Sequence, residues 1–238
     1  MKIIADLHMH TLVSQHAYST VSEMAQTAKA KDFTAFAITD HAPAMPDGAI
    51  EHHFFCMSGN MPEYIDGMRF YKGVEANIID YDGTIDMTPD TLKRLDFVIA
   101  SYHSECIKPK NVDEHTKGLI KVLQNPYVDC LGHCGNPAYE IDPEQIVAAC
   151  KKYHKILEIN SSSFRIRLGS EKNCSAVAKL CAKMRVPIIV SSDAHSMWFV
   201  GEHTDALKML DSISFPEELV LNADSDRLTE YFNSRDYR

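Results

Sequence analysis

The sequence predicts an irregular α/β barrel of seven parallel strands. Two observations support this prediction. Seven short apolar runs are typical of strands, and their ends recur every 27 to 34 residues, the length of a strand, a helix and two loops. Six of these seven runs end in His, Asp or Glu. Because functional side chains of parallel barrels gather at the carboxyl ends of the strands, this placement favours a barrel with one functional face.

The expected elements follow this rhythm in order. The runs that we assign to strands cover residues 3–7, 35–39, 72–74, 97–102, 128–132, 156–160 and 187–192. Segments with helical periodicity lie between them, at residues 21–31, 112–123, 143–153 and 170–184. Ser19 and Thr20 suit the cap of the first helix, and Asp142 with Pro143 suits the start of the third. Residues 42–64 contain several Pro, Met and Gly residues and are expected to form a long loop over the carboxyl ends of the strands.

Length and composition limit the class of protein. With 238 residues, 45% of them hydrophobic, and no linker, the chain is expected to form a single domain over residues 1–238. A net charge of −9 argues against binding long nucleic acids, which requires clustered Lys and Arg. Seven cysteines without a Cys-x-x-Cys pattern indicate reduced thiols and a cytoplasmic protein. The apolar runs predict neither a signal peptide nor a membrane span.

The residues at the strand ends are of the types that bind metal ions. His8 and His10 flank one residue of a strand, so their side chains point to the same face and can hold one ion. Asp193 and His195 repeat this spacing at the last strand. The other strand ends carry Asp40, His41, Glu75, His103 and His133. A set of about nine nitrogen and oxygen ligands without a thiolate cluster suits two or three Zn²⁺, Mn²⁺ or Fe²⁺ ions.

Two of these carboxylates, Glu75 and Asp193, are candidates for bridging two cations, because a carboxylate offers two oxygens. His16 follows His8 by eight residues and can curl back from its loop as a further ligand. The alternative is that each His is an ordinary interior residue with its hydrogen bonds satisfied. That explanation must hold at six strand ends independently, and burying so many titratable groups without metals costs much desolvation free energy.

Other candidate residues lie away from the strand ends. His52 and His53 belong to the expected loop at residues 42–64, where each either meets a substrate or is merely exposed. Three histidines fall on predicted helices away from the functional face and are expected to be solvated: His115, His154 and His203. Cys134 directly follows a candidate ligand, but its side chain should point away from His133 and serve packing.

The ordered set of strand-end residues resembles the PHP (polymerase and histidinol phosphatase) family of metal-dependent phosphoesterases. The family pattern is His-x-His, Asp-His, Glu, two separated His and a final Asp-x-His, and it spans nearly the whole chain. Residues 6–11, 16–20, 132–137 and 158–164 are similar to the YcdX-type phosphatases. This resemblance implies a distorted seven-stranded (β/α)7 TIM-like barrel with a trinuclear, usually zinc, centre.

The resemblance also implies a distribution of ligands. One ion would take His8, His10, Glu75 and Asp193. A second would take Glu75, His103 and His133, and a third His16, His41 and His195.

The resulting hypothesis is a cytoplasmic, metal-dependent hydrolase of phosphate monoesters, acting on a small phosphorylated substrate. Two close cations would turn a bridging water into hydroxide, the nucleophile, and a third would neutralise phosphate charge. Arg165 and Arg167, after the strand that lacks a ligand, can reach phosphate oxygens, together with His53. Asp40 or a water would protonate the leaving group.

Three alternatives remain open at this point. One is a phosphodiesterase or exonuclease for short oligonucleotides, which the acidic surface disfavours less than long DNA. Another is a two-metal amidohydrolase, although no Lys stands at a strand end. The last is a metal-binding module without catalytic activity.

Overall fold

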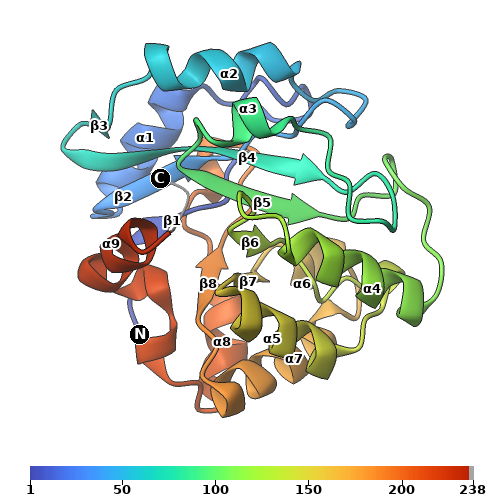
Figure 1. The fold of residues 1–238 in the computed structure, drawn as a ribbon. Coiled ribbons are helices and arrows are strands. Elements are labelled where there is room, and N and C mark those ends of the chain that lie inside the picture. The colour runs from blue at the N-terminus through green and yellow to red at the C-terminus, as the bar shows by residue number, and fades with distance from the viewer. Residues whose placement is uncertain (236–238) are drawn as a thin grey trace.

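The seven expected strands form one parallel sheet that curves into a nearly closed barrel (Figure 1). The computed structural model describes residues 1–235, so the last three residues of the expected domain lie outside the described residues. The strands follow the order β1-β2-β4-β5-β6-β7-β8, and β3 pairs with β4 antiparallel. Their bounds are β1 Ala5–Asp6, β2 Ala35–Ile38, β3 Tyr64–Ile65, β4 Met68–Asn77, β5 Phe97–Ser101, β6 Cys130–Leu131, β7 Ile156–Asn160 and β8 Ile188–Ser191. The prediction of a (β/α)7 TIM-like barrel is confirmed.

Bridges between the first and last strands bring the barrel close to closure. Met9 pairs with Ala194 in parallel, just beyond the ends of β1 and β8. Within these strands, the Asn222 side chain donates to the carbonyls of Ala5 in β1 and Val190 in β8 at 2.7 and 2.6 Å and accepts from the Val190 amide at 3.0 Å. One amide side chain therefore satisfies backbone groups that a missing strand would otherwise leave unpaired.

Nine α-helices lie around the outside of the barrel in the described residues (Figure 1). Their bounds are α1 Val21–Ala30, α2 Glu51–Asn60, α3 Pro89–Leu92, α4 Val112–Leu123, α5 Pro143–Tyr153, α6 Ser163–Ile166, α7 Ser170–Met184, α8 Thr204–Ser212 and α9 Ser225–Asn233. Short 3-10 helices span η1 Pro137–Tyr139, η2 Met197–Phe199, η3 Glu217–Leu219 and η4 Leu221–Ala223. The four predicted helices are confirmed, with Thr20 capping α1 and Asp142 capping α5.

One expected loop is partly helical. Residues 42–64 contain α2 and reach into β3, whereas the sequence predicted an irregular segment throughout. This helix has no side-chain cap, and it buries only Phe54 and Met57, so its apolar face is too narrow to produce a clear helical period.

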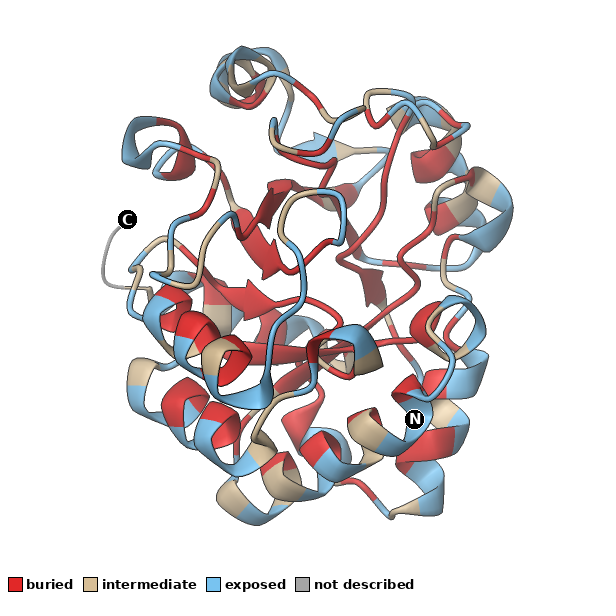
Figure 2. Cartoon of the chain, turned by 90° about the vertical axis from the view of Figure 1, so that its right-hand side faces the viewer, coloured by how far each residue is buried: buried red, intermediate tan, exposed pale blue. Residues whose placement is uncertain are grey.

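Burial separates the barrel from its surroundings. Figure 2 shows buried residues along the strands and on the inner faces of the helices, with exposed residues on their outer faces. Among residues 1–235, no helix is long and apolar enough to cross a membrane.

All seven cysteines are free thiols. Cys134 packs against the main core, and burial raises the pKa of its thiol, so its predicted packing role is confirmed.

Two of the three histidines predicted to be solvated are buried. His115 donates Nδ1–H to the Glu140 carbonyl and accepts from the Lys110 amide at Nε2, each at 2.8 Å. His203 lies with Nε2 3.4 Å from Asp6 Oδ2. Burial favours a raised pKa for the Asp6 carboxyl, but the His203 imidazole outweighs it and lowers that pKa. Both predictions were wrong because a distant partner, rather than the helix pattern, determines burial. His154 is exposed, as predicted.

Candidate metal centre

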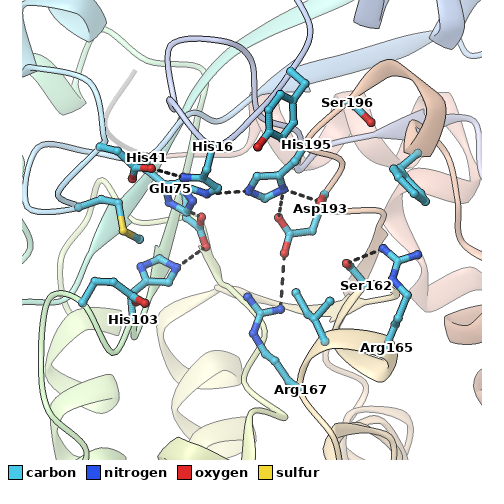
Figure 3. Close-up of a pocket in the computed structure, with 16 residues that line it drawn as sticks. His16, His41, Glu75, His103, Ser162, Arg165, Arg167, Asp193, His195 and Ser196 are labelled. Atoms are coloured by element: carbon cyan, nitrogen blue, oxygen red, sulfur yellow. Dashed lines mark hydrogen bonds and ion pairs between the residues drawn. The ribbon is translucent and has the colours of Figure 1, made fainter.

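The predicted ligands surround a cavity of about 640 Å³ at the carboxyl ends of the strands (Figure 3). Its lining includes His16, His41, Glu75, His103, Asp193 and His195. His8, His10 and His133 lie directly beneath, each at most 3% exposed. Six strand ends, far apart in the sequence, thus bring nine potential ligands to one place, because parallel strands have their carboxyl ends on the same side.

Backbone pairing aligns the strand ends that carry the candidate ligands. The His10 amide donates to the Ala194 carbonyl at 2.8 Å, which places the ends of β1 and β8 side by side. His41 pairs with Glu75 just after β2. His133 and Asp193 have φ angles of 29° and 53°, in the left-handed region that non-glycine residues rarely adopt. Such strain persists only where surrounding contacts hold it, and it is common at functional sites.

Four donor atoms converge on one point. His8 Nε2 lies 3.0 Å from His10 Nε2, 3.3 Å from Glu75 Oε2 and 3.5 Å from Asp193 Oδ1. His10 Nε2 lies 3.5 Å from that Glu75 oxygen and 3.2 Å from that Asp193 oxygen. Ligands about 2.0–2.2 Å from a tetrahedral ion are separated by roughly 3.3–3.6 Å. The five separations, 3.0–3.5 Å, are close to the spacing around one Zn²⁺, and His8, His10 and Glu75 form a group that could hold an ion.

Glu75 links this group of four atoms to a second group, formed by the imidazoles of His103 and His133. Its other oxygen, Oε1, lies 3.0 Å from His133 Nε2 and 3.3 Å from His103 Nε2. His41 Nδ1 lies 2.9 Å from Glu75 Oε2, but without the alignment of a hydrogen bond. On the outer side of the cluster, His16 Nε2 and His195 Nε2 face each other at 3.0 Å. One carboxylate thus stands between two groups of imidazoles, as a bridging ligand would.

Hydrogen bonds at the far side of the rings fix which nitrogen faces the centre. His8 donates Nδ1–H to Glu158 Oε1 at 2.5 Å. His16 donates Nδ1–H to Asp47 Oδ2 at 2.7 Å, and His103 donates Nδ1–H to Asn77 Oδ1 at 2.7 Å. His195 donates Nδ1–H to the Asp193 carbonyl at 3.0 Å. A neutral imidazole that donates at Nδ1 carries its lone pair at Nε2. In their neutral form all four rings therefore direct the lone pair of Nε2 inward, the arrangement of metal-ligating histidines.

Charge within the cluster favours a cation. Burial disfavours an imidazolium at His8, but the carboxylates of Glu158, Glu75 and Asp193 outweigh it and raise the pKa of His8 well above its usual value. Burial and the neighbouring rings of His41 and His195 hold the pKa of His10 well below its usual value, so this ring is neutral. Burial also lowers the pKa of His133, to about 4.

The two carboxylates remain ionised. Burial alone raises the pKa of Glu75 and Asp193, but neighbouring imidazoles, His8 foremost, lower both values well below the usual range. Ionised carboxylates beside neutral imidazoles form the nitrogen and oxygen donor set that suits Zn²⁺, Mn²⁺ or Fe²⁺. The residues present therefore fit bound divalent metal.

Comparisons with known proteins agree with this site. The family model described as "PHP domain" matches residues 6–164, and the model "PHP-associated" matches residues 172–215. The chain belongs to the PHP family. It is 46% identical over 241 residues to a probable phosphatase from Acetivibrio thermocellus, covering 100% of this chain and 98% of that protein. It is also 45% identical over 240 residues to a probable phosphatase from Caldanaerobacter subterraneus subsp. tengcongensis, covering 99% of this chain and 93% of that one.

A solved structure shares the PHP fold at low identity. Histidinol phosphate phosphatase from Lactococcus lactis subsp. lactis, complexed with zinc, L-histidinol and phosphate, matches with a TM-score of 0.63 and 18% identity. The match covers 89% of this chain and 94% of that chain, and it supports the barrel assignment. The prediction of a metal-dependent phosphatase of the PHP family is thus confirmed at the level of the class by the family match and the full-length relatives, and the clustered His and Glu residues fit the metal dependence.

Sequence reasoning missed Glu158, which connects four parts of this PHP barrel. The residue is 1% exposed, and it lies in β7, the strand whose end carries no ligand. Besides the His8 imidazole, its carboxylate accepts from the His133 amide at 2.6 Å, the Ser191 hydroxyl at 2.5 Å and the Asn160 amide group at 3.3 Å. A charged residue between Leu157 and Ile159, in an otherwise apolar run, was the signal that could have revealed it.

Asn77 and Asp47 were also missed. Asn77 stands two residues after Glu75 in β4, so both side chains point to the same face. Its amide group donates to Asp86 at 2.6 Å, which fixes the carbonyl oxygen toward His103. Asp47 lies in the segment that was expected to be an irregular loop, where no local pattern indicates a contact with His16.

The structure does not bring Asp40 and His53 to the metal-site cavity. Asp40 is 1% exposed, and its carboxylate accepts from the Thr11 amide and hydroxyl and the Ser14 hydroxyl, each at 2.7 Å. Both residues line a separate cavity beside α1 and α2. Asp40 is therefore corrected from a proton donor to a residue that holds the loop after β1, and His53 from a substrate ligand to a residue of α2.

Both predicted arginines line the cavity, but they differ in their contacts (Figure 3). Arg167 lies with Nη1 3.5 Å from Asp193 Oδ2 and donates to the Ser163 hydroxyl at 2.9 Å. Arg165 donates to the Ser162 hydroxyl at 3.3 Å and packs over the Phe199 ring. Arg167 thus stands beside the ligands, whereas Arg165 belongs to the outer rim.

Proposed function

We propose that this protein is a phosphatase of the YcdX type that hydrolyses monoesters of small phosphorylated molecules with three divalent ions, Zn²⁺ being the best match. The observation that carries the proposal is the convergence of His8, His10, Glu75 and Asp193 on one point beside Arg167. Full-length similarity to probable phosphatases supports the reaction class. A cytoplasmic location remains part of the proposal, because free thiols persist in reducing compartments.

The proposed ligand sets follow the two oxygens of Glu75. Oε2 belongs to the set with His8, His10 and Asp193, and Oε1 belongs to the set with His103 and His133. His16, His41 and His195 form the third set. His41 Nδ1 lies 2.9 Å from Glu75 Oε2, and this closeness supports a third set next to the other two.

The chain's own residues would then prepare the reaction. When bound, the ions supply positive charge for the phosphate and acidify a water, which gives hydroxide as the nucleophile. Glu158, Asn77 and Asp47 hold imidazoles in one tautomer, so that the ligand atoms do not reorganise during the reaction. Arg167 offers N–H groups to phosphate oxygens from the side of the cavity next to Asp193.

The test compares a monoester with its diester. We expect para-nitrophenyl phosphate to be hydrolysed with a kcat/KM about tenfold or more above that of bis-para-nitrophenyl phosphate, because only a monoester presents a terminal dianion to the three sets and Arg167. Arg167→Ala should raise KM and lower kcat/KM for the monoester by about tenfold to a hundredfold, the range of a charge-assisted contact.

A matched control is Arg185→Ala, which removes an exposed Arg that pairs with Glu218 at 2.8 Å. This variant should keep the wild-type kcat/KM. A preference for the diester that Arg167→Ala does not change would replace the proposal with a phosphodiesterase.

A further inference from the structure

Exposed apolar side chains gather at the mouth of the metal-site cavity. Among the described residues, eleven large hydrophobic residues are exposed. Three of them line this cavity: Tyr18, Ile166 and Phe199. Leu168 and Trp198 are neighbours of lining residues in the sequence and are 83% and 76% exposed. Exposed apolar residues scattered singly need no explanation, but a group around one cavity indicates binding.

The aromatic residues of this mouth are fixed relative to the ligands. The Tyr18 amide donates to the His195 carbonyl at 2.7 Å. The Met197 amide, in η2, donates to the Ser19 hydroxyl at 2.9 Å. The segment that carries Tyr18 and the segment that carries Phe199 are therefore tied to each other and to a ligand. The backbone that carries these two rings is therefore held next to the site where phosphate would bind.

Phe199 and Arg165 form a flat wall at this mouth. The guanidinium carbon of Arg165 lies 4.8 Å from the centroid of the Phe199 ring. Arg165 is held in turn by its hydrogen bond to Ser162, and Phe199 remains 44% exposed. An aromatic face and a guanidinium plane both favour stacking with another flat ring. Contact with a linear polar chain would stabilise the Phe199 ring and the Arg165 guanidinium less than stacking does.

The cavity has room for more than phosphate. Its volume of about 640 Å³ falls within the range of sites for drug-sized molecules, roughly 300–1,000 Å³. Its lining combines buried carboxylates and imidazoles, such as Glu75 and Asp193, with three exposed apolar residues, Tyr18, Ile166 and Phe199. A protein partner would fit a flat apolar face, but these residues share a concave surface with His195 and Arg167. A small ligand with a charged part and an apolar part fits this arrangement better.

We propose that the natural substrate is a phosphate monoester whose leaving group carries an aromatic ring, bound between the Tyr18 segment and the Phe199–Arg165 wall. This inference rests on the proposed phosphatase function and specifies the substrate class. The phosphate would lie over the ligands beside Arg167, and the ring would lie at the mouth.

The test uses three alkyl phosphates: phenylethyl, cyclohexylethyl and ethyl phosphate. Their leaving alcohols have similar acidity, so a difference in kcat/KM reports binding of the side group rather than intrinsic reactivity. We expect phenylethyl phosphate to exceed ethyl phosphate by about tenfold or more, and cyclohexylethyl phosphate by about threefold or more, because ring stacking adds to apolar burial.

Variants identify the residues that read the ring. Phe199→Leu keeps an apolar side chain but removes the ring, and it should lower the ratio of phenylethyl to cyclohexylethyl phosphate toward one. Tyr18→Leu, on the other segment, should lower the same ratio independently. The matched control is Phe55→Leu, because Phe55 is an exposed ring of α2 with the Arg94 guanidinium 4.1 Å from its centroid. This control should keep the wild-type ratio.

The outcomes separate the two proposals. If the wild-type enzyme hydrolyses all three esters with equal kcat/KM, or if both variants at the mouth keep the wild-type ratio, the aromatic substrate class is overturned while phosphatase activity stands. If none of these esters nor para-nitrophenyl phosphate releases phosphate from metal-loaded enzyme, the proposed function itself fails.

Discussion

Replacing Glu158 by Gln should weaken metal binding although Glu158 is not itself a proposed ligand. The carboxylate accepts four hydrogen bonds, from His8, His133, Ser191 and Asn160. A Gln side chain has nearly the same volume but only one acceptor oxygen, and its NH₂ group must face a donor. Either the His8 ring or the His133 amide then loses its partner, so the His8 tautomer is no longer fixed.

The magnitude follows from the bond that is lost. A hydrogen bond to a charged group contributes about 1.5–3 kcal/mol. Removing a partner that orients a metal-ligating His typically lowers metal affinity by about 10–100-fold, which corresponds to roughly 1.4–2.7 kcal/mol. The two ranges agree, so we expect Glu158→Gln to raise the dissociation constant for Zn²⁺ at the His8 set by about 10–100-fold.

The assay is competition with a chromophoric zinc chelator, with circular dichroism as a check that the barrel is folded. Glu51→Gln is the matched control. The Glu51 carboxylate also accepts several hydrogen bonds, from the Thr88 amide and hydroxyl and from Thr91, but it lies on α2 away from the ligands. It should lose stability without losing zinc. Equal zinc affinity in Glu158→Gln and wild type would refute the orienting role.

Three further predictions concern the ligands and the loop after β1. Glu75→Gln should reduce kcat by more than about a hundredfold in a folded protein, because both oxygens face imidazoles and an amide has no charge to hold two cations. Normal turnover with full metal content would remove the bridging role. Elemental analysis of wild type should give about three ions per chain and His16→Ala about two, since His16 belongs to the third set alone. One ion or none in active wild type would contradict the ligand sets. Asp40→Asn should lower the free energy of unfolding by about 2 kcal/mol, because one oxygen can serve the Thr11 amide and the Ser14 hydroxyl, but the NH₂ group at the other position cannot accept from the Thr11 hydroxyl. Its pH–rate profile should keep the wild-type shape, and loss of the acidic or basic limb would restore Asp40 as a proton donor.

The sequence predicted well which of these side chains come together, because their positions depend on a simple rule. Parallel strands have their carboxyl ends on one side, so His8, Glu75, His133 and Asp193 meet whatever the details of packing. The starts of two helices were equally predictable, because the Thr20 and Asp142 side chains each accept a hydrogen bond from a backbone amide only three residues further along the chain.

Contacts between distant segments were not predictable from local pattern. Strand alternation indicates that Glu158 faces inward, but only the folded barrel shows that it meets His8, 150 residues away. In the same way, Asp40 looked like its neighbour His41 in the sequence, and yet the two side chains reach different cavities. His115 and His203 were misjudged because the helix pattern says nothing about a partner on another segment.

The sequence by itself thus determined the barrel and the kind of atoms at its carboxyl end, because both follow from local periodicity and strand direction. The tertiary structure decided which imidazole nitrogen faces the centre, which carboxylate orients a ligand, and which aromatic rings stand at the mouth. These features depend on side-chain geometry between segments far apart in the chain, and a hydrogen bond such as that between Asp47 and His16 exists only once those segments are packed.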